Sequence, residues 1–157
     1  MKNIKPKIIL LLITGLLIAS TNVNAQRSNK GWGQDSNYGR LFNASTVETI
    51  NGTVEAVEFI SMDTKTSTGI HLAVKTKSQT ISVHLGPSWY LDNQEIQFEK
   101  GDEITVTGSR ISYQNAPAII AVEIEKGDDI LLLRDKAGYP VWSGWRKKGK
   151  RKKRNNN

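Results

Sequence analysis

The two histidines of this 157-residue sequence, His71 and His84, are the pair whose spacing most directly suggests chemistry. Each lies in a run of alternating apolar and polar residues, which is typical of a β-strand. A turn at residues 77–78 would join the two runs in a hairpin and place the histidines directly opposite each other, pointing away from the apolar side chains. Directly opposed side chains have Cβ atoms about 4.5–5.5 Å apart. The sequence therefore predicts that both imidazoles meet on one outward face.

Two imidazoles at that separation could share a transition metal, or one could be protonated beside a neutral neighbour. Two ligands are few for tight binding, so a metal site would need a third. Three residues are candidates: Asp92, Tyr113 and Asp135. Simple packing of the rings beneath Trp89 or Tyr90 is the favoured alternative, and a contact with another ligand is the third. His71 and His84 are thus a hypothetical metal or ligand site.

Aromatic residues form a second group that could bind a ligand, comprising Trp89, Tyr90, Trp142 and Trp145. Aromatic side chains exposed on a small barrel can stack on bases or sugars. Packing at the ends of a barrel is favoured here, because these residues flank a predicted helical turn and the last predicted strand.

Arg134 is followed directly by Asp135, and Asp102 comes just before the predicted strand that contains Arg110. We expect the two arginines to form ion pairs with Asp102 or Asp135 rather than to contact phosphate groups.

A strongly basic segment, residues 146–157, ends the sequence and contains no apolar residue. Its cations are Arg146, Lys147, Lys148, Lys150, Arg151, Lys152, Lys153 and Arg154. Mutual repulsion predicts disorder, and affinity for DNA, anionic lipid or acidic polysaccharide would fall steeply with salt. Residues 26–145, in contrast, hold 11 Lys and Arg against 15 Asp and Glu, a net charge of −4. Affinity for a polyanion is therefore expected mainly in the tail, although a solvated tail without a partner is the alternative.

The first 25 residues have the pattern of a secretory signal peptide: three lysines, an apolar run at residues 8–19, and small residues before a cleavage point after Ala25. The apolar run is shorter than the roughly 20 residues of a membrane-spanning helix. We expect export to the periplasm or the medium, and no integral membrane anchor after cleavage.

Cysteine is absent from the sequence. This excludes disulfides, cysteine-ligated metals, a thiol nucleophile and covalently attached haem. No Gly-x-Ser-x-Gly, His-Glu-x-x-His or phosphate-binding glycine loop occurs either. We therefore expect a protein that is not an enzyme.

Composition divides the chain after the leader into a linker, a domain and the tail. Residues 26–45 are rich in Gly, Ser and Asn without an apolar period, which predicts a flexible linker. Its aromatic residues Trp32, Tyr38 and Phe42 are expected at the surface, with docking on the domain or a partner as the alternative. Residues 46–145 form the β domain.

Five strands are predicted in this domain, at residues 46–60, 70–76, 80–85, 104–111 and 118–124. A short helix follows Gly86-Pro87, and residues 130–133 and 138–142 close the domain. This order predicts an all-β, five-stranded OB-like barrel with one short helix, with an SH3-like barrel as the alternative.

The domain also resembles a known family, through segments spread over residues 46–145. These are Gly69-Ile70-His71-Leu72, Val83-His84-Leu85-Gly86-Pro87 with Trp89-Tyr90, Gly101-Asp102, Val106-Thr107-Gly108-Ser109-Arg110, and Leu133-Arg134-Asp135 with Gly138-Tyr139-Pro140-Val141-Trp142. They resemble exported bacterial OB-like domains, some described as DNA-binding, which are related to the domain shared by the magnetosome proteins MamS and MamX. The resemblance implies an exported, non-catalytic module that assists metal or redox proteins of the envelope. MamX-type proteins carry Cys-x-x-Cys-His haem motifs, so the lack of cysteine rules out carrying over covalent haem.

Two main functions follow as hypotheses. The first is an exported OB-like binding module that contacts an envelope protein or small ligand near His71 and His84 and adheres to anionic surfaces through its tail. The alternative is a nucleic-acid or polyanion binding protein, and a third possibility is an accessory of envelope metal or redox proteins.

Overall fold

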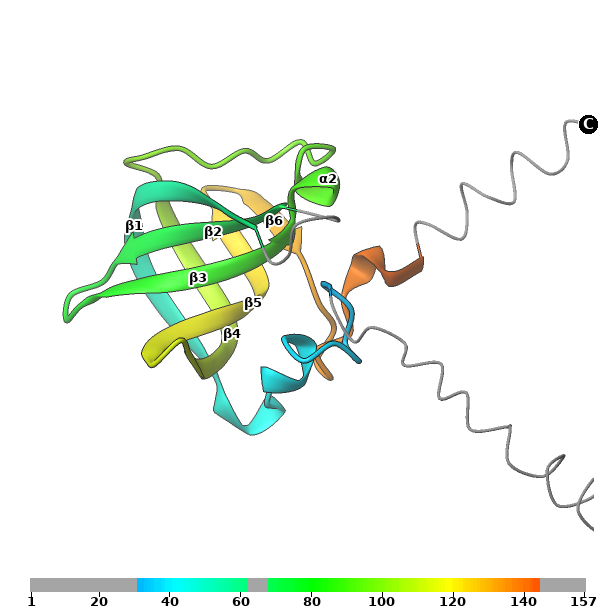
Figure 1. Ribbon diagram of the computed structural model, residues 1–157. Helices are drawn as coiled ribbons and strands as arrows, with labels where there is room; N and C mark the ends of the chain where they lie inside the picture. The colour runs from blue at the N-terminus through cyan, green and yellow to red at the C-terminus, as the bar shows by residue number, and fades with distance from the viewer. Residues whose placement is uncertain (1–30, 62–67, 145–157) are drawn as a thin grey trace, which may run out of the picture.

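The computed structural model describes residues 31–61 and 68–144, and β-strands make up about half of these residues (Figure 1). The strands are β1 (Val47–Ser61), β2 (Thr68–Lys75), β3 (Thr80–Pro87), β4 (Glu103–Tyr113), β5 (Ala116–Lys126) and β6 (Asp129–Leu132). The helical turns are η1 (Gly39–Leu41), η2 (Ala44–Thr46), α2 (Ser88–Leu91) and η3 (Val141–Gly144).

One sheet with the strand order β3-β2-β1-β4-β5-β6 closes on itself through a parallel pairing of β3 with β5. The long β1 makes this possible, because its first half pairs with β4 and its second half with β2, with a register shift between Val54 and Ala56. The all-β OB-like barrel with a short helix is confirmed. The five strands predicted for the barrel are β1–β5, which close it, and the turn at Gly127 (φ 61°) returns the chain as a sixth strand, β6, along β5.

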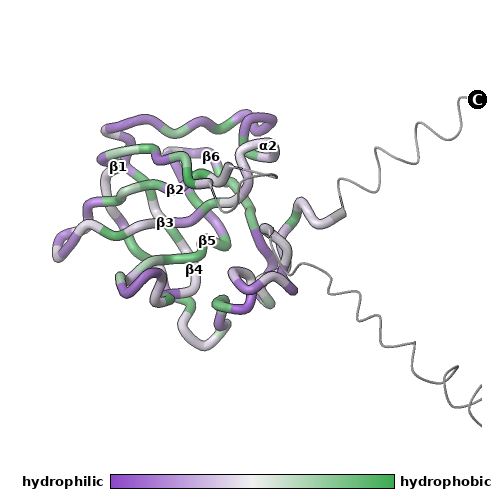
Figure 2. Tube along the Cα trace, in the orientation of Figure 1, coloured by the Kyte–Doolittle hydropathy of each residue, from purple (hydrophilic) through white to green (hydrophobic). Residues whose placement is uncertain are grey.

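The interior of the barrel is aliphatic, as the alternation in the sequence predicts. The fully buried side chains include Leu72, Val74, Ile81, Val83, Val106, Ile119 and Ile124. Figure 2 shows apolar positions recurring along the strands, while the hairpin tips are hydrophilic. Because successive strand residues point to opposite faces, the intervening residues of β2 and β3 project outward.

Two terminal segments cover part of this outward face: the N-terminal strap (residues 31–46) and the C-terminal segment (residues 133–144). In Figure 1 they lie together on one side of the barrel. Trp32 and Tyr38 of the strap are each only 7% exposed and belong to the core cluster. The expectation that Trp32 and Tyr38 lie at the surface is therefore wrong, and the alternative that they dock on the domain holds for both. These aromatics do not recur with a helix or strand period, and such a period is the signal that reveals a packed segment in a sequence.

The predicted signal peptide (residues 1–25), Trp145 and the basic tail (residues 146–157) lie outside the described residues. Within residues 31–61 and 68–144, no helix combines the length and apolar character needed to cross a membrane.

Candidate functional site

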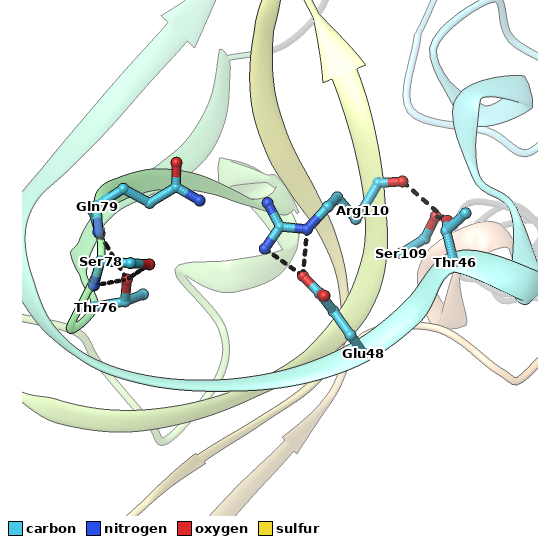
Figure 3. A network of polar contacts seen from close by, with 7 residues as sticks. All are labelled: Thr46, Glu48, Thr76, Ser78, Gln79, Ser109 and Arg110. Atoms are coloured by element: carbon cyan, nitrogen blue, oxygen red, sulfur yellow. Dashed lines mark hydrogen bonds and ion pairs between the residues drawn. The ribbon is translucent and has the colours of Figure 1, made fainter.

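The β2–β3 hairpin brings the two histidines together as predicted. His71 and His84 are cross-strand partners, in the pair next to Leu72 and Val83, whose side chains point into the barrel. The turn holds this register: the Thr76 hydroxyl accepts a hydrogen bond from the Gln79 backbone N–H at 3.2 Å (Figure 3). The same hydroxyl donates to the Gln79 carbonyl at 2.8 Å. The histidines therefore share the outward face of the hairpin.

Both imidazoles are buried on that face, with His71 3% and His84 1% exposed. Their rings stack, with centroids 3.6 Å apart and planes 9° from parallel. Tyr38 of the strap stacks on His84 at 5.7 Å, and Tyr113 of β4 meets His84 edge-on at 4.9 Å. The cover predicted from Trp89 or Tyr90 comes instead from Tyr38, Tyr113 and Trp32, whose ring centroid lies 6.2 Å from that of His71.

The stacked geometry does not suit a shared metal. An imidazole nitrogen binds a metal through a lone pair in the ring plane, and a metal in the plane of one ring would lie well outside the plane of the other. In the described part of the chain, no three His, Asp or Glu side chains are grouped to hold a metal. Of the candidate third ligands, Tyr113 contributes only ring contacts, whereas the Asp135 carboxylate accepts hydrogen bonds from the backbone N–H groups of Ala137 and Tyr139. Asp92 lies at the C-terminal end of α2. The metal hypothesis at His71 and His84 is therefore not supported.

Burial keeps the side chains of His71, His84 and Tyr38 uncharged at neutral pH. It lowers the pKa of His71 to about 4, and it lowers the pKa of His84 to about 3 with further contributions from positive charge at His71 and Arg134. Burial also raises the pKa of Tyr38. Tyr38 Oη and His84 Nδ1 are hydrogen bonded at 2.8 Å, whereas His71 Nε2 has no hydrogen-bond partner among the described residues. At neutral pH the cluster is thus a set of neutral hydrogen-bonding rings.

Arg134 is also buried, with 4% exposure, and its setting differs from the predicted ion pair. Its Nη1 donates hydrogen bonds to the carbonyls of Leu85 and Ala121, and its guanidinium carbon lies 4.9 Å from the centroid of the Trp142 ring. Burial lowers its pKa to about 10, so it stays protonated at neutral pH.

The predicted acidic partners of the two arginines are corrected as well. Arg110 binds the Glu48 carboxylate at 2.6 Å across the β1–β4 pair (Figure 3), and Asp102 pairs with Lys126 at 2.7 Å. These partners come from neighbouring strands, which sequence proximity does not indicate.

The predicted aromatic contacts are mostly inside the protein. Tyr90 and Trp142 are buried and pack on each other with ring centroids 5.4 Å apart. Trp142 lies over Gly86, where any Cβ would be 2.6 Å from its ring, and its Nε1–H donates to the Trp32 carbonyl at 3.2 Å. Trp89 is partly buried against the core. Tyr90 and Trp142 therefore do not present a stacking surface.

Sequence reasoning missed the strap residues Trp32 and Tyr38 as members of this site. The available signal was the presence of large aromatics in a segment otherwise rich in Gly, Ser and Asn, together with glycines beside the histidines. Gly69 leaves the space that the Trp32 ring occupies, since a Cβ there would overlap the ring. The strap itself is tied down at its end, where Thr46 Oγ1 lies 3.0 Å from Ser109 Oγ and donates to the Arg110 carbonyl (Figure 3).

Comparison with known proteins gives a family match and distant structural likenesses. No curated protein matches the chain. Among solved structures, the chain is similar to one in the crystal structure of the S. pombe Stn1-ten1 complex. That match has 18% identity and a TM-score of 0.40, and it covers 69% of this chain and 71% of that chain.

The family match confirms the resemblance that the sequence motifs carry. Residues 46–131 match the model of the MamS/MamX magnetosome protein family, a stretch that includes β1–β5, most of β6 and both histidines. Since this is more than half of the chain, the protein belongs to the MamS/MamX magnetosome protein family.

Proposed function

We propose that this protein is an exported, non-enzymatic binding module that attaches to anionic surfaces through its basic tail and presents its barrel to an envelope protein. The observation that carries the proposal is the sealing of the hairpin face by the strap. OB-folds bind oligonucleotides and oligosaccharides on the face of strands 2 and 3. Here that region is occupied by Trp32 and Tyr38, which pack on His71 and His84.

Charge supports assigning polyanion affinity to the tail. Residues 26–145 carry a net charge of −4, whereas residues 146–154 contain eight cations among nine residues. A buried neutral cluster on an acidic domain attracts phosphate poorly, and clustered Lys and Arg displace counterions from a polyanion.

Exposed apolar side chains support a protein partner for the barrel. Phe59 on β1 is 66% exposed and Ile130 on β6 is 65% exposed. Aromatic side chains such as Phe59 are enriched at protein–protein interfaces. Membership of a magnetosome protein family fits an accessory role beside metal or redox proteins of the envelope.

The decisive experiment compares residues 26–157 with a truncation that ends at Trp145. We expect binding to duplex DNA and to anionic vesicles to be lost on truncation. The intact chain should show a log–log salt slope of up to about −7 on duplex DNA, because eight cations each contribute about 0.9. A full-length control with all eight cations changed to Gln should behave like the truncation. Binding that persists in both would place the affinity on the barrel and contradict the proposal.

Nucleic-acid binding is the alternative function, since the same eight cations would bind DNA. A competition experiment distinguishes a protein that binds anionic surfaces in general from one that binds nucleic acid. Anionic vesicles or an acidic polysaccharide, added at the same concentration of negative charge as the DNA, should displace DNA from a general binder of anionic surfaces. Retention of DNA against both competitors at 0.15 M salt would favour the alternative. Export is tested by fractionation and by N-terminal sequencing, with Gln26 expected as the first residue.

A further inference from the structure

Arg134 is a buried cation without a counter-charge in the described part of the chain. The ion pairs there join Lys75 to Glu55, Arg110 to Glu48 and Lys126 to Asp102, and none involves Arg134. Two backbone carbonyls and the face of Trp142 are its polar and aromatic neighbours. An unpaired charge in the interior is costly because little water remains to solvate it.

The guanidinium has hydrogen-bonding capacity left over. It carries five N–H groups, of which those on Nη1 are directed to Leu85 and Ala121. Among the described side chains, only His71 Nε2 is both fully buried and without a partner. The Nε and Nη2 groups of Arg134 donate no hydrogen bond to another of the described residues.

A small cavity lies beside Arg134. Arg134 lines it together with Trp32, Tyr38 and Phe42 of the strap, Ile120 of β5 and Gly138 of the C-terminal segment. It measures about 10 Å³, which is room for the centre of one water-sized particle. The backbone at Gly138 has φ 84°, and a Cβ there would overlap the Phe42 ring, so a glycine is what allows the turn to close over the cavity.

We propose that this cavity binds a monoatomic anion, chloride in practice, against Arg134. No Asp or Glu lines it, so the only formal charge at its wall is the guanidinium. Attraction between opposite charges is much stronger there than in water. The small volume favours a monoatomic anion over phosphate or sulfate. The aromatic and aliphatic walls suit an ion that is weakly hydrated.

The bound anion would also join three parts of the chain that are distant in sequence. The strap, β5 and the C-terminal segment all line the cavity. Because all three parts line the cavity, the anion stabilises the strap over the histidine pair.

Bromide substitution tests the site directly. Crystals of residues 26–157 are grown or soaked in bromide, and anomalous diffraction is recorded at the bromine edge. We expect a peak within about 3.5 Å of an Arg134 nitrogen, inside the cavity, as for a charge-assisted contact. Full occupancy of that position by water, or bromide only at surface lysines, would overturn the proposal.

Thermal unfolding gives a second readout that does not require a stable variant crystal. For residues 26–157, the Tm should rise saturably when chloride replaces gluconate at constant ionic strength. Arg134→Gln should abolish this rise, whereas Arg110→Gln, at an exposed ion pair, should keep it. Equal dependence on chloride in all three proteins would contradict the proposal. If Arg134→Gln does not fold, the bromide peak alone decides.

Discussion

The two faces of the β2–β3 hairpin are held by different physical means. The inner face buries aliphatic side chains such as Leu72 and Val83 in the barrel. The outer face buries His71 and His84 under residues of the strap. The inner contacts depend on removing apolar area from water, which is non-directional. The outer contacts depend on ring geometry, hydrogen bonds and charge state.

The stability of the barrel and the docking of the strap on it should therefore respond to different substitutions. Loss of an inner side chain should weaken the whole barrel. Disturbing the outer layer should release residues 31–46 first, because these residues reach the barrel through a few aromatic contacts and the anchor at Ser109.

The largest effect is expected at the centre of the inner face. Leu72→Ala removes a fully buried side chain and should lower the free energy of unfolding by about 2–5 kcal/mol, through lost burial and a cavity. Urea denaturation followed by circular dichroism measures it. Leu132→Ala, at an exposed position on β6, is the matched control and should cost about 0.5 kcal/mol or less. Equal losses in the two variants would mean that the barrel interior does not dominate stability.

The second-largest effect is expected from acid, which should lower the free energy of unfolding by protonating the histidines of the outer face. The pKa values of His71 and His84 in the folded protein lie below the ordinary value near 6.5, so below that pH the unfolded chain binds more protons. The contribution of the neutral pair is therefore complete above about pH 6.5 and is lost as the pH falls toward 4 and 3. Between pH 7 and 5 we expect the free energy of unfolding to fall by about 2–4 kcal/mol.

Urea midpoints at pH 7, 6 and 5 measure this dependence. The control is the double variant His71→Gln, His84→Gln, which removes the titrating groups and should be flatter over the same range. Parallel curves for the two proteins would show that the imidazoles are not the source of the acid sensitivity.

The Trp32 ring occupies a notch in β2 that exists because Gly69 has no side chain. Filling this notch should release the strap while leaving the barrel folded. In Gly69→Ala the new Cβ overlaps the Trp32 ring, which must swing away, at a cost of about 1–3 kcal/mol. Trp fluorescence should shift to the red, and the strap should be cut faster by protease while the barrel's circular dichroism is unchanged. Gly33→Ala adds a methyl group with no atom within 4 Å and serves as the control. Unchanged fluorescence in Gly69→Ala would show that the notch does not hold the strap.

The same contrast explains what the sequence could predict. Alternation within a strand and the length of the turn fix which residues face each other, so the pairing of His71 with His84 followed from local pattern. What covers the pair could not be predicted, because Trp32 and Tyr38 reach it across about forty residues of chain without any period. Arg134 shows the same limit: its sequence neighbour Asp135 closes the turn to Tyr139 instead of pairing with it.

The smallest effect should come from the ion pair between Arg110 and Glu48, which lies on the barrel surface (Figure 3). Their side chains are 37% and 38% exposed, so water screens the attraction and the coupling should be below about 1 kcal/mol. A double-mutant cycle with Arg110→Ala and Glu48→Ala measures it, and 0.5 M salt should reduce it further. A coupling above about 2 kcal/mol would mean that this pair acts as a buried contact does. The distinction between an exposed arginine that water largely satisfies and Arg134, which depends on its protein surroundings, would then fail.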